Sequence, residues 1–292
     1  MKARRLIEVL TCMLAAVLTA SADSRFDAVE YSVTDLGQGI YRLEASGGNI
    51  GLSIGEDGAF LIDGQYAPLT PKLLKAVGDL TDQPVKFLIN THWHGDHVGG
   101  NANLAATGAV VAAHNNVRSR MAAPGPKQYP EEALPVITFS DTTTWYLNGL
   151  KIHAFHVEHA HTDGDAIIHI PEANIIHAGD ILFNGLYPYI DLDSGGSVDG
   201  YIAAMEQLAE LANEETQIIA GHGPLGNKAD VKRSIALVKD AKSRVAALVK
   251  AGKSLDEVQA ADPLADYHAD WAWRFITAEK MTAILYRDAA GE

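Results

Sequence analysis

The chain has 292 residues, of which 47% are hydrophobic, 21% charged and 7% aromatic, a composition that excludes disorder and collagen-like repeats. Its 23 Lys and Arg residues face 37 Asp and Glu residues, which gives a formal net charge of -14. Because so acidic a surface repels phosphate backbones and anionic lipid heads, we expect neither nucleic acid nor a membrane surface as a partner.

The N-terminal segment has the pattern of a secretory signal peptide. Three basic residues among the first five precede a mostly apolar run over 6–18, and small residues follow up to Ala22. We expect cleavage near Ala22, which removes residues 1–22 and leaves a periplasmic or secreted protein. The apolar run is too short for a permanent membrane anchor. Residues 23–292 are expected to form a single domain with a helical C-terminal tail.

The remainder of the chain alternates short apolar runs with amphipathic segments. The Gly55-Glu56-Asp57-Gly58 run signals a turn and predicts a hairpin. Strand, helix, strand order predicts parallel pairing under a covering helix, so we expect two mixed sheets with helices outside them. In chain order the patterns predict strands at 39–43, 49–54 and 59–63, a helix over 68–80, strands at 85–90, 109–114, 151–157, 166–170 and 174–178, a helix over 197–212, a strand at 216–220, a helix over 228–251 and a mainly helical tail over 254–290.

Chemistry is concentrated in the loop that follows the apolar strand 85–90. Three histidines and an aspartate occupy six positions, and loops at the carboxyl ends of strands present ligands in α/β proteins. His92 and His94, two positions apart, can point the same way from an extended segment, whereas Asp96 and His97 turn with the chain and face another point. One loop can therefore hold two metal ions.

The type of metal follows from the available ligands. The only cysteine, Cys12, lies inside the expected signal peptide, so the processed protein has no thiolate to offer. Imidazole and carboxylate groups without thiolate suit zinc, with iron or manganese as alternatives.

Five motifs in order resemble the metallo-β-lactamase superfamily of dinuclear zinc hydrolases. They are Asp63 at the end of an early strand, the loop over 92–97, His161 in His-Thr-Asp-Gly-Asp, Asp180 after an apolar strand, and His222 between two glycines. The resemblance covers residues from about 30 to 225.

The resemblance implies a fold and a metal site. The implied fold is an α/β (α+β) four-layer αβ/βα sandwich with the metal site at one edge of two mixed sheets. It also implies that Asp63 orients the loop over 92–97 without touching metal. Two zinc ions would be held, the first by His92, His94 and His161 and the second by Asp96, His97 and His222, with Asp180 bridging them.

A dinuclear zinc site implies hydrolysis of a small-molecule substrate without a protein nucleophile. Asp96 is then the expected partner for the proton. The expected substrate is a β-lactam amide; a lactone or another ester, thioester or phosphodiester is the alternative. A metal-binding protein without turnover, such as a zinc carrier, is a second alternative, and an open coordination position distinguishes an enzyme from it.

Some residues outside these motifs are also assigned. Ser53 fits a serine hydrolase pattern, but it lies along a strand and is expected to be structural. Asp191 and Asp193 are expected in a solvated turn. His159 is a candidate neighbour of the metals. Trp93 is expected to pack beneath the loop, Tyr187 and Tyr189 are candidates to line the cleft, and Trp271 and Trp273 are expected in the core.

Overall fold

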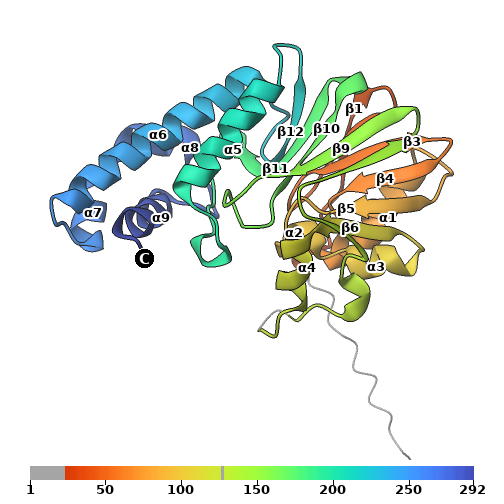
Figure 1. Ribbon diagram of the computed structural model, residues 1–292, viewed down its shortest axis with the longest axis horizontal. Coiled ribbons are helices and arrows are strands. Elements are labelled where there is room, and N and C mark those ends of the chain that lie inside the picture. Colours follow the sequence, from red (N-terminus) through yellow and green to blue (C-terminus); the bar gives the residue numbers. More distant parts are fainter. Residues whose placement is uncertain (1–23, 126–127) are drawn as a thin grey trace, which may run out of the picture.

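The computed structural model describes residues 24–125 and 128–292. The expected signal peptide lies outside this range. Two β-sheets lie face to face and helices cover the outer side of each, as Figure 1 shows. This arrangement confirms the predicted four-layer α/β sandwich.

The first sheet contains seven strands, which lie across it in chain order. Strands β1 to β4 pair antiparallel and β4 to β7 pair parallel. The predicted hairpin is confirmed, since Gly55 pairs with Gly58 across its turn. The strands are β1 (Ser32–Gly37), β2 (Ile40–Glu44), β3 (Ile50–Gly55), β4 (Gly58–Ile62), β5 (Val85–Ile89), β6 (Val110–His114) and β7 (Ile137–Phe139).

The second sheet has the order β12-β11-β10-β9-β8 and is also mixed, because β11 and β12 pair parallel while the other pairs are antiparallel. Two boundaries differ from the prediction. The strand expected at 174–178 continues to Phe183, so Asp180 lies within it, and the strand expected at 216–220 continues to His222. The strands are β8 (Thr142–Leu147), β9 (Leu150–His156), β10 (Ala166–Ile170), β11 (Ile175–Phe183) and β12 (Gln217–His222).

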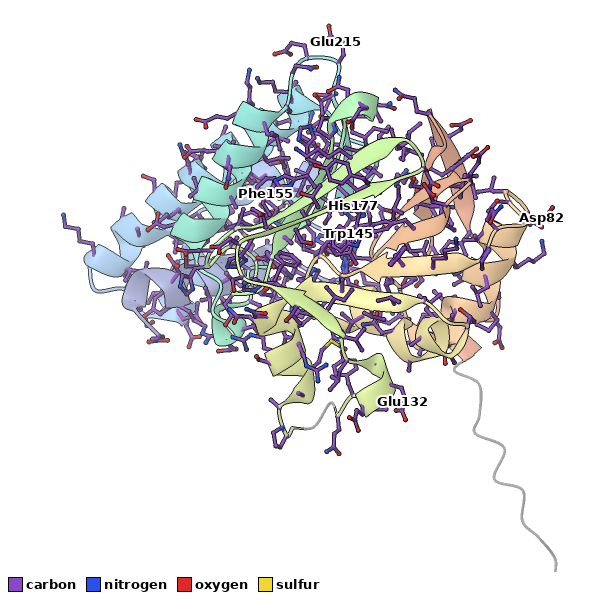
Figure 2. The ribbon with its side chains drawn as sticks, turned by 45° about the vertical axis from the view of Figure 1, so that its right-hand side comes forward. Asp82, Glu132, Trp145, Phe155, His177 and Glu215 are labelled. Atoms are coloured by element: carbon purple, nitrogen blue, oxygen red, sulfur yellow. The ribbon has the colours of Figure 1, made fainter. Side chains whose placement is uncertain are left out.

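Strand β4 shows how the sequence supports two cores at once. Successive side chains of a strand point to opposite faces of the sheet. Phe60 and Ile62 pack between the two sheets, whereas Ala59 and Leu61 pack under helix α1 (Thr70–Gly78). All five residues of β4 are therefore buried. Figure 2 shows Trp145 and His177 in the middle of the molecule, with Asp82, Glu132 and Glu215 at its periphery.

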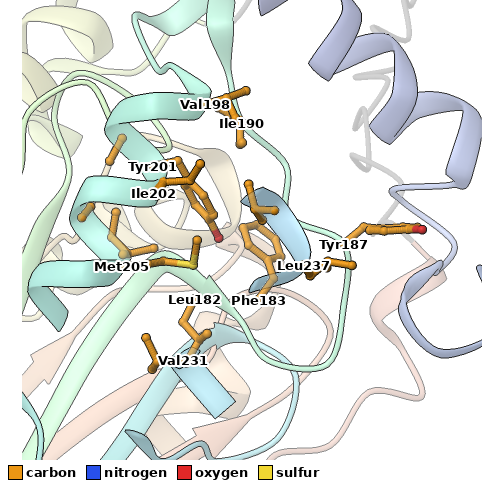
Figure 3. Close-up of a cluster of buried hydrophobic side chains, with 14 of the residues drawn as sticks. Leu182, Phe183, Tyr187, Ile190, Val198, Tyr201, Ile202, Met205, Val231 and Leu237 are labelled. Atoms are coloured by element: carbon orange, nitrogen blue, oxygen red, sulfur yellow. The ribbon is translucent and has the colours of Figure 1, made fainter. Parts of the chain in front are cut away.

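Helices α5 (Val198–Leu211) and α6 (Lys228–Lys250) cover the second sheet, near the ranges expected for them. Ser197 caps α5, and Asn227 with Asp230 forms a capping box on α6, which explains where both begin. Tyr201 and Met205 pack with Leu182 and Phe183 of β11, as Figure 3 shows.

The tail is helical as predicted, and the expected helix over 68–80 is a 3-10 turn followed by the shorter α1. In the described part of the chain, no helix has the length and apolar character needed to cross a membrane. The remaining helices are α2 (Gly95–Val98), α3 (Asn101–Ala106), α4 (Asn115–Ala122), α7 (Leu255–Ala261), α8 (His268–Trp271) and α9 (Ala278–Ala290). The 3-10 turns are η1 (Ser24–Phe26), η2 (Ala67–Leu69), η3 (Glu131–Ala133), η4 (Pro171–Ala173), η5 (Leu192–Ser194) and η6 (Ala265–Tyr267).

Candidate metal centre

The two sheets are joined where β3 meets β12. The backbone N–H of Asn49 donates to the carbonyl of Gly221 at 2.7 Å, and the Asn49 side chain donates to the carbonyl of Ala220 at 2.8 Å. His222 follows directly at the end of β12. These bonds hold the end of β12 against the first sheet, whose β5 leads into the histidine loop.

The structure brings all seven side chains of the expected ligand set together. They form two groups, and within each group the candidate ligand atoms lie within 4.8 Å of one another. Asp180 lies between the groups: its Oδ2 is 3.4 Å from His161 Nε2, and its Oδ1 is 3.2 Å from His97 Nε2. The first group is His92, His94, His161 and Asp180, and the second is Asp96, His97 and His222.

Hydrogen bonds on the outer side of two imidazoles determine which ring nitrogen carries the proton. The Thr91 hydroxyl donates to Asp63 Oδ2 at 2.8 Å, so it accepts from His92 Nδ1 at 3.0 Å. Asp63 Oδ2 also accepts from His97 Nδ1 at 2.7 Å. Both Nε2 atoms therefore present lone pairs to the interior of the cluster. Asp63 thus orients the loop from outside.

The other two imidazoles of the first group follow the same rule. His161 Nδ1 donates to the carbonyl of Tyr189 at 2.7 Å, and His94 Nε2 donates to Asp191 Oδ2 at 2.9 Å. When both rings are neutral, the inward nitrogens, His161 Nε2 and His94 Nδ1, face each other with lone pairs at a separation of 2.9 Å. A cation shared between the two nitrogens, either a proton or a metal ion, removes the repulsion between these lone pairs.

Buried polar atoms support the same conclusion. His92 Nε2, His97 Nε2 and Asp180 Oδ1 are buried and have no hydrogen-bond partner among the described residues. Leaving a buried polar atom unpaired costs about 1 to 3 kcal/mol, so native proteins rarely do so without a reason. A divalent cation bound by nitrogen and oxygen ligands would satisfy all three, and this ligand set fits zinc.

The electrostatics of the pocket show the same demand for positive charge. Burial by itself lowers the pKa of His97, but the carboxylates around it, Asp180 foremost, raise it well above the usual value. Burial likewise opposes a charge on His222, yet Asp180 and Asp96 raise its pKa to about 9. The carboxylates of this pocket thus favour the protonated form of the neighbouring imidazoles. Bound metal cations would take the place of those protons.

Asp191 was wrongly expected in a solvated turn. It is buried, it accepts from His94, and it also accepts from the backbone N–H of Ser194 at 3.2 Å. Burial would raise the pKa of Asp191, but the hydrogen bonds from His94 and Ser194 hold it far below the usual range. No local sequence signal marks this residue, because its partner lies 97 positions away.

We expect Asp191→Ala to lower zinc affinity about 10- to 100-fold, because His94 loses the group that fixes its tautomer and orientation. Chelator competition at fixed pH measures this affinity. Asp193→Ala is the matched control, since Asp193 is exposed and pairs with Arg287 on the outside. Equal zinc affinities in the two folded variants would refute the role of Asp191.

The structure also places the other candidate residues that the sequence indicated. His159 is exposed and bonds the carbonyl of Gly195, outside both groups. Ser53 is buried within β3, as expected for a structural residue. Tyr187 is fully buried in the core, so it does not line the cleft, whereas Tyr189 does.

A cleft of about 770 Å³ opens above the two groups. Trp93 packs against the group of buried hydrophobic residues that includes Val98, and it also lines this cleft. Trp271 lies in the core as expected, and Trp273, also expected there, packs against the same core while it lines the cleft. The aromatic residues that line the cleft are Phe26, Tyr66, Trp93, Phe183, Tyr189, Trp273 and Phe275.

Comparison with known proteins agrees with this geometry. The family model of the metallo-beta-lactamase superfamily matches residues 43–222, a range that contains all seven clustered side chains. A metallo-beta-lactamase structure from Pontibacter korlensis aligns with a TM-score of 0.62 at 20% identity, covering 72% of this chain and 100% of that one. At that identity the likeness concerns the fold alone.

Two sequence relatives carry different names. The metallo-beta-lactamase type 2 of Bacteroides fragilis is 25% identical over 159 residues, which is 54% of this chain and 61% of that protein. A hydroxyacylglutathione hydrolase of a Polaromonas species is 30% identical over 167 residues, which is 55% of this chain and 57% of that protein. The chain thus spans about three fifths of the length of each.

Proposed function

This chain belongs to the metallo-beta-lactamase superfamily, whose members are metal-dependent hydrolases, and from that premise we propose that it is a zinc-dependent hydrolase that opens a β-lactam amide. One observation carries the proposal: inward lone pairs and carboxylates converge from four segments of the chain at the floor of one cleft. Such a floor suits a catalytic site, because the cleft gives a substrate access to it.

Each side chain has a proposed task. One zinc ion would be held by His92, His94 and His161, and the other by Asp96, His97 and His222. Asp180 would contact both ions. When bound, the ions supply a hydroxide nucleophile at neutral pH and stabilise the charge that develops on the carbonyl oxygen.

Asp96 lines the cleft as well as belonging to the second group. Burial would raise its pKa, but His97 and His222 lower it to about 2, so the group is a carboxylate at neutral pH. We assign Asp96 to accept a hydrogen bond from the attacking water and to receive its proton. This role requires a carboxylate that faces the substrate, which the position of Asp96 in the cleft wall provides.

The choice of substrate rests on two kinds of support. Relatives named metallo-beta-lactamase favour an amide. The similarity to hydroxyacylglutathione hydrolases, at 30% identity, favours an ester or thioester as the second candidate. Water attack on an activated carbonyl is common to both. Export to the periplasm, proposed from the pattern of residues 1–22, is consistent with a substrate outside the cytoplasm.

Nitrocefin turnover by the purified, zinc-loaded full chain tests the proposal, with a γ-lactone and a thioester assayed in parallel. We expect nitrocefin hydrolysis that a chelator abolishes and added zinc restores. Hydrolysis of only the lactone or thioester would replace the substrate. If no member of the panel reacts at full zinc occupancy, the proposed hydrolysis is refuted and the metal-binding protein without turnover becomes the favoured alternative.

A further inference from the structure

The outer wall of the cleft comes from parts of the chain beyond the family match at 43–222. Phe26 lies before that range, and Trp273, Arg274 and Phe275 lie between α8 and α9, about 50 positions after it. Because these residues lie outside the part that holds the zinc ligands, they can determine which substrate reaches the floor without altering the floor itself.

Trp273 is fixed beside the metal centre. Its indole Nε1 donates to the carbonyl of Tyr187 at 2.9 Å, and its backbone N–H donates to the carbonyl of Ile276 at 3.1 Å. Its ring centroid is 5.6 Å from that of His222. Anchored at its polar edge, the indole offers a flat apolar surface next to a proposed zinc ligand.

Phe275 extends this surface outward. Its ring lies 5.5 Å from Tyr189 and 5.6 Å from Trp273, in edge-on arrangements of 72° and 70°. It remains 49% exposed, whereas most large hydrophobic residues in the described part of the chain are buried. A partly exposed aromatic residue in the wall of a cleft is what an apolar ligand group would cover.

Arg274, between Trp273 and Phe275 in the sequence, adds a positive charge to the same cleft wall. Its side chain is exposed in the cleft wall, and among the described residues it has no hydrogen-bonding or ion-pairing partner. The protein as a whole carries a formal charge of -14, and most arginines in the described part pair with carboxylates. An unpaired guanidinium fits a carboxylate, which it can bind through two parallel hydrogen bonds.

We propose that the substrate carries a flat aromatic or apolar group that packs on Trp273 and Phe275, and a carboxylate that Arg274 binds. This inference rests on the proposed function only in that the cleft above the zinc ligands is the substrate site. It narrows the substrate class to anionic carbonyl compounds with an aromatic side group.

Binding of 1-naphthylacetate and of its neutral amide to the zinc-loaded full chain tests this without requiring turnover. A carboxylate can also bind zinc, so the decisive quantity is the ratio of the two dissociation constants in wild type and in Arg274→Gln. We expect the wild type to bind the acid more tightly than the amide. In the variant the ratio of the two dissociation constants should shift about fivefold toward the amide, which is the size expected for a partly exposed ion pair. Arg233→Gln, on the exposed side of α6, is the matched control.

The aromatic surface has its own variants. Phe275→Ala and Trp273→Ala should each weaken naphthylacetate binding about fivefold to tenfold, and Trp273→Phe should restore most of the loss because it keeps a flat ring. Undetectable binding to wild type, an unchanged acid preference in Arg274→Gln, or unchanged affinity in both aromatic variants would overturn the inference. Probe binding through these residues without hydrolysis of any panel member would refute the proposed function alone.

Discussion

Asp180→Ala is expected to lower kcat/KM for the hydrolysed substrate by about 10³-fold or more. Among the described side chains, Asp180 is the one whose two oxygens face both groups of ligands. Bound metal ions lower the activation barrier by several kcal/mol, and each 1.4 kcal/mol is tenfold in rate. The buried histidines would also lose the carboxylate that draws positive charge to the site. Steady-state kinetics with metal content measured on the same sample provide the test.

The matched control for this change is Asp199→Ala. Asp199 lies in the first turn of α5, and its exposed carboxylate pairs with Lys242. Its loss should leave kcat/KM unchanged. Asp180→Asn keeps the shape of the side chain and guards against simple misfolding of the alanine variant. If a folded Asp180→Asn enzyme kept the wild-type rate and its full metal content, the bridging role would be wrong.

Gly221→Ala is expected to lower kcat/KM about 10²-fold, which is the scale of a 1 Å misplacement of catalytic groups. A Cβ at this position would overlap Asp180 Oδ1 and come within 2.7 Å of the backbone of Gly179. The backbone of β11 cannot yield easily, because β11 is buried along its whole length and paired on both sides. The added methyl should also destabilise the fold by about 1 to 3 kcal/mol.

Gly78→Ala makes the same chemical change where there is room for it. Gly78 ends α1, and a Cβ there meets nothing within 4 Å. Alanine should therefore leave kcat/KM unchanged and stabilise the protein by about 0.5 to 1 kcal/mol. Thermal melts and kinetics on both variants separate the two positions. Wild-type activity in Gly221→Ala would show that Asp180 can shift without cost, contrary to our account.

The loop over 92–97 was predictable because its information is local. Alternation of side chains along an extended segment placed His92 and His94 together and directed Asp96 and His97 elsewhere. The fold followed from the same kind of evidence, since buried strands such as β4 and helices with clear caps such as α6 have strong periodic patterns.

Other features depend on contacts that a single sequence does not display. Strand β1 was missed because its residues are almost all exposed, so it lacks an apolar alternation. Asp191 and Trp273 reach the site only through the packing of distant segments. For Trp273 the sequence shows an ordinary aromatic residue in a helical tail, and only tertiary structure turns its ring toward His222.

The metal content of the purified protein tests the central claim most directly. After dialysis against zinc-buffered solution, mass spectrometry of the metals should find two zinc ions per wild-type chain, one for each group of ligands. His94→Ala and His222→Ala remove one ligand from different groups, so each folded variant should retain about one ion. Less than one ion in the wild type, or two in both variants, would contradict the account.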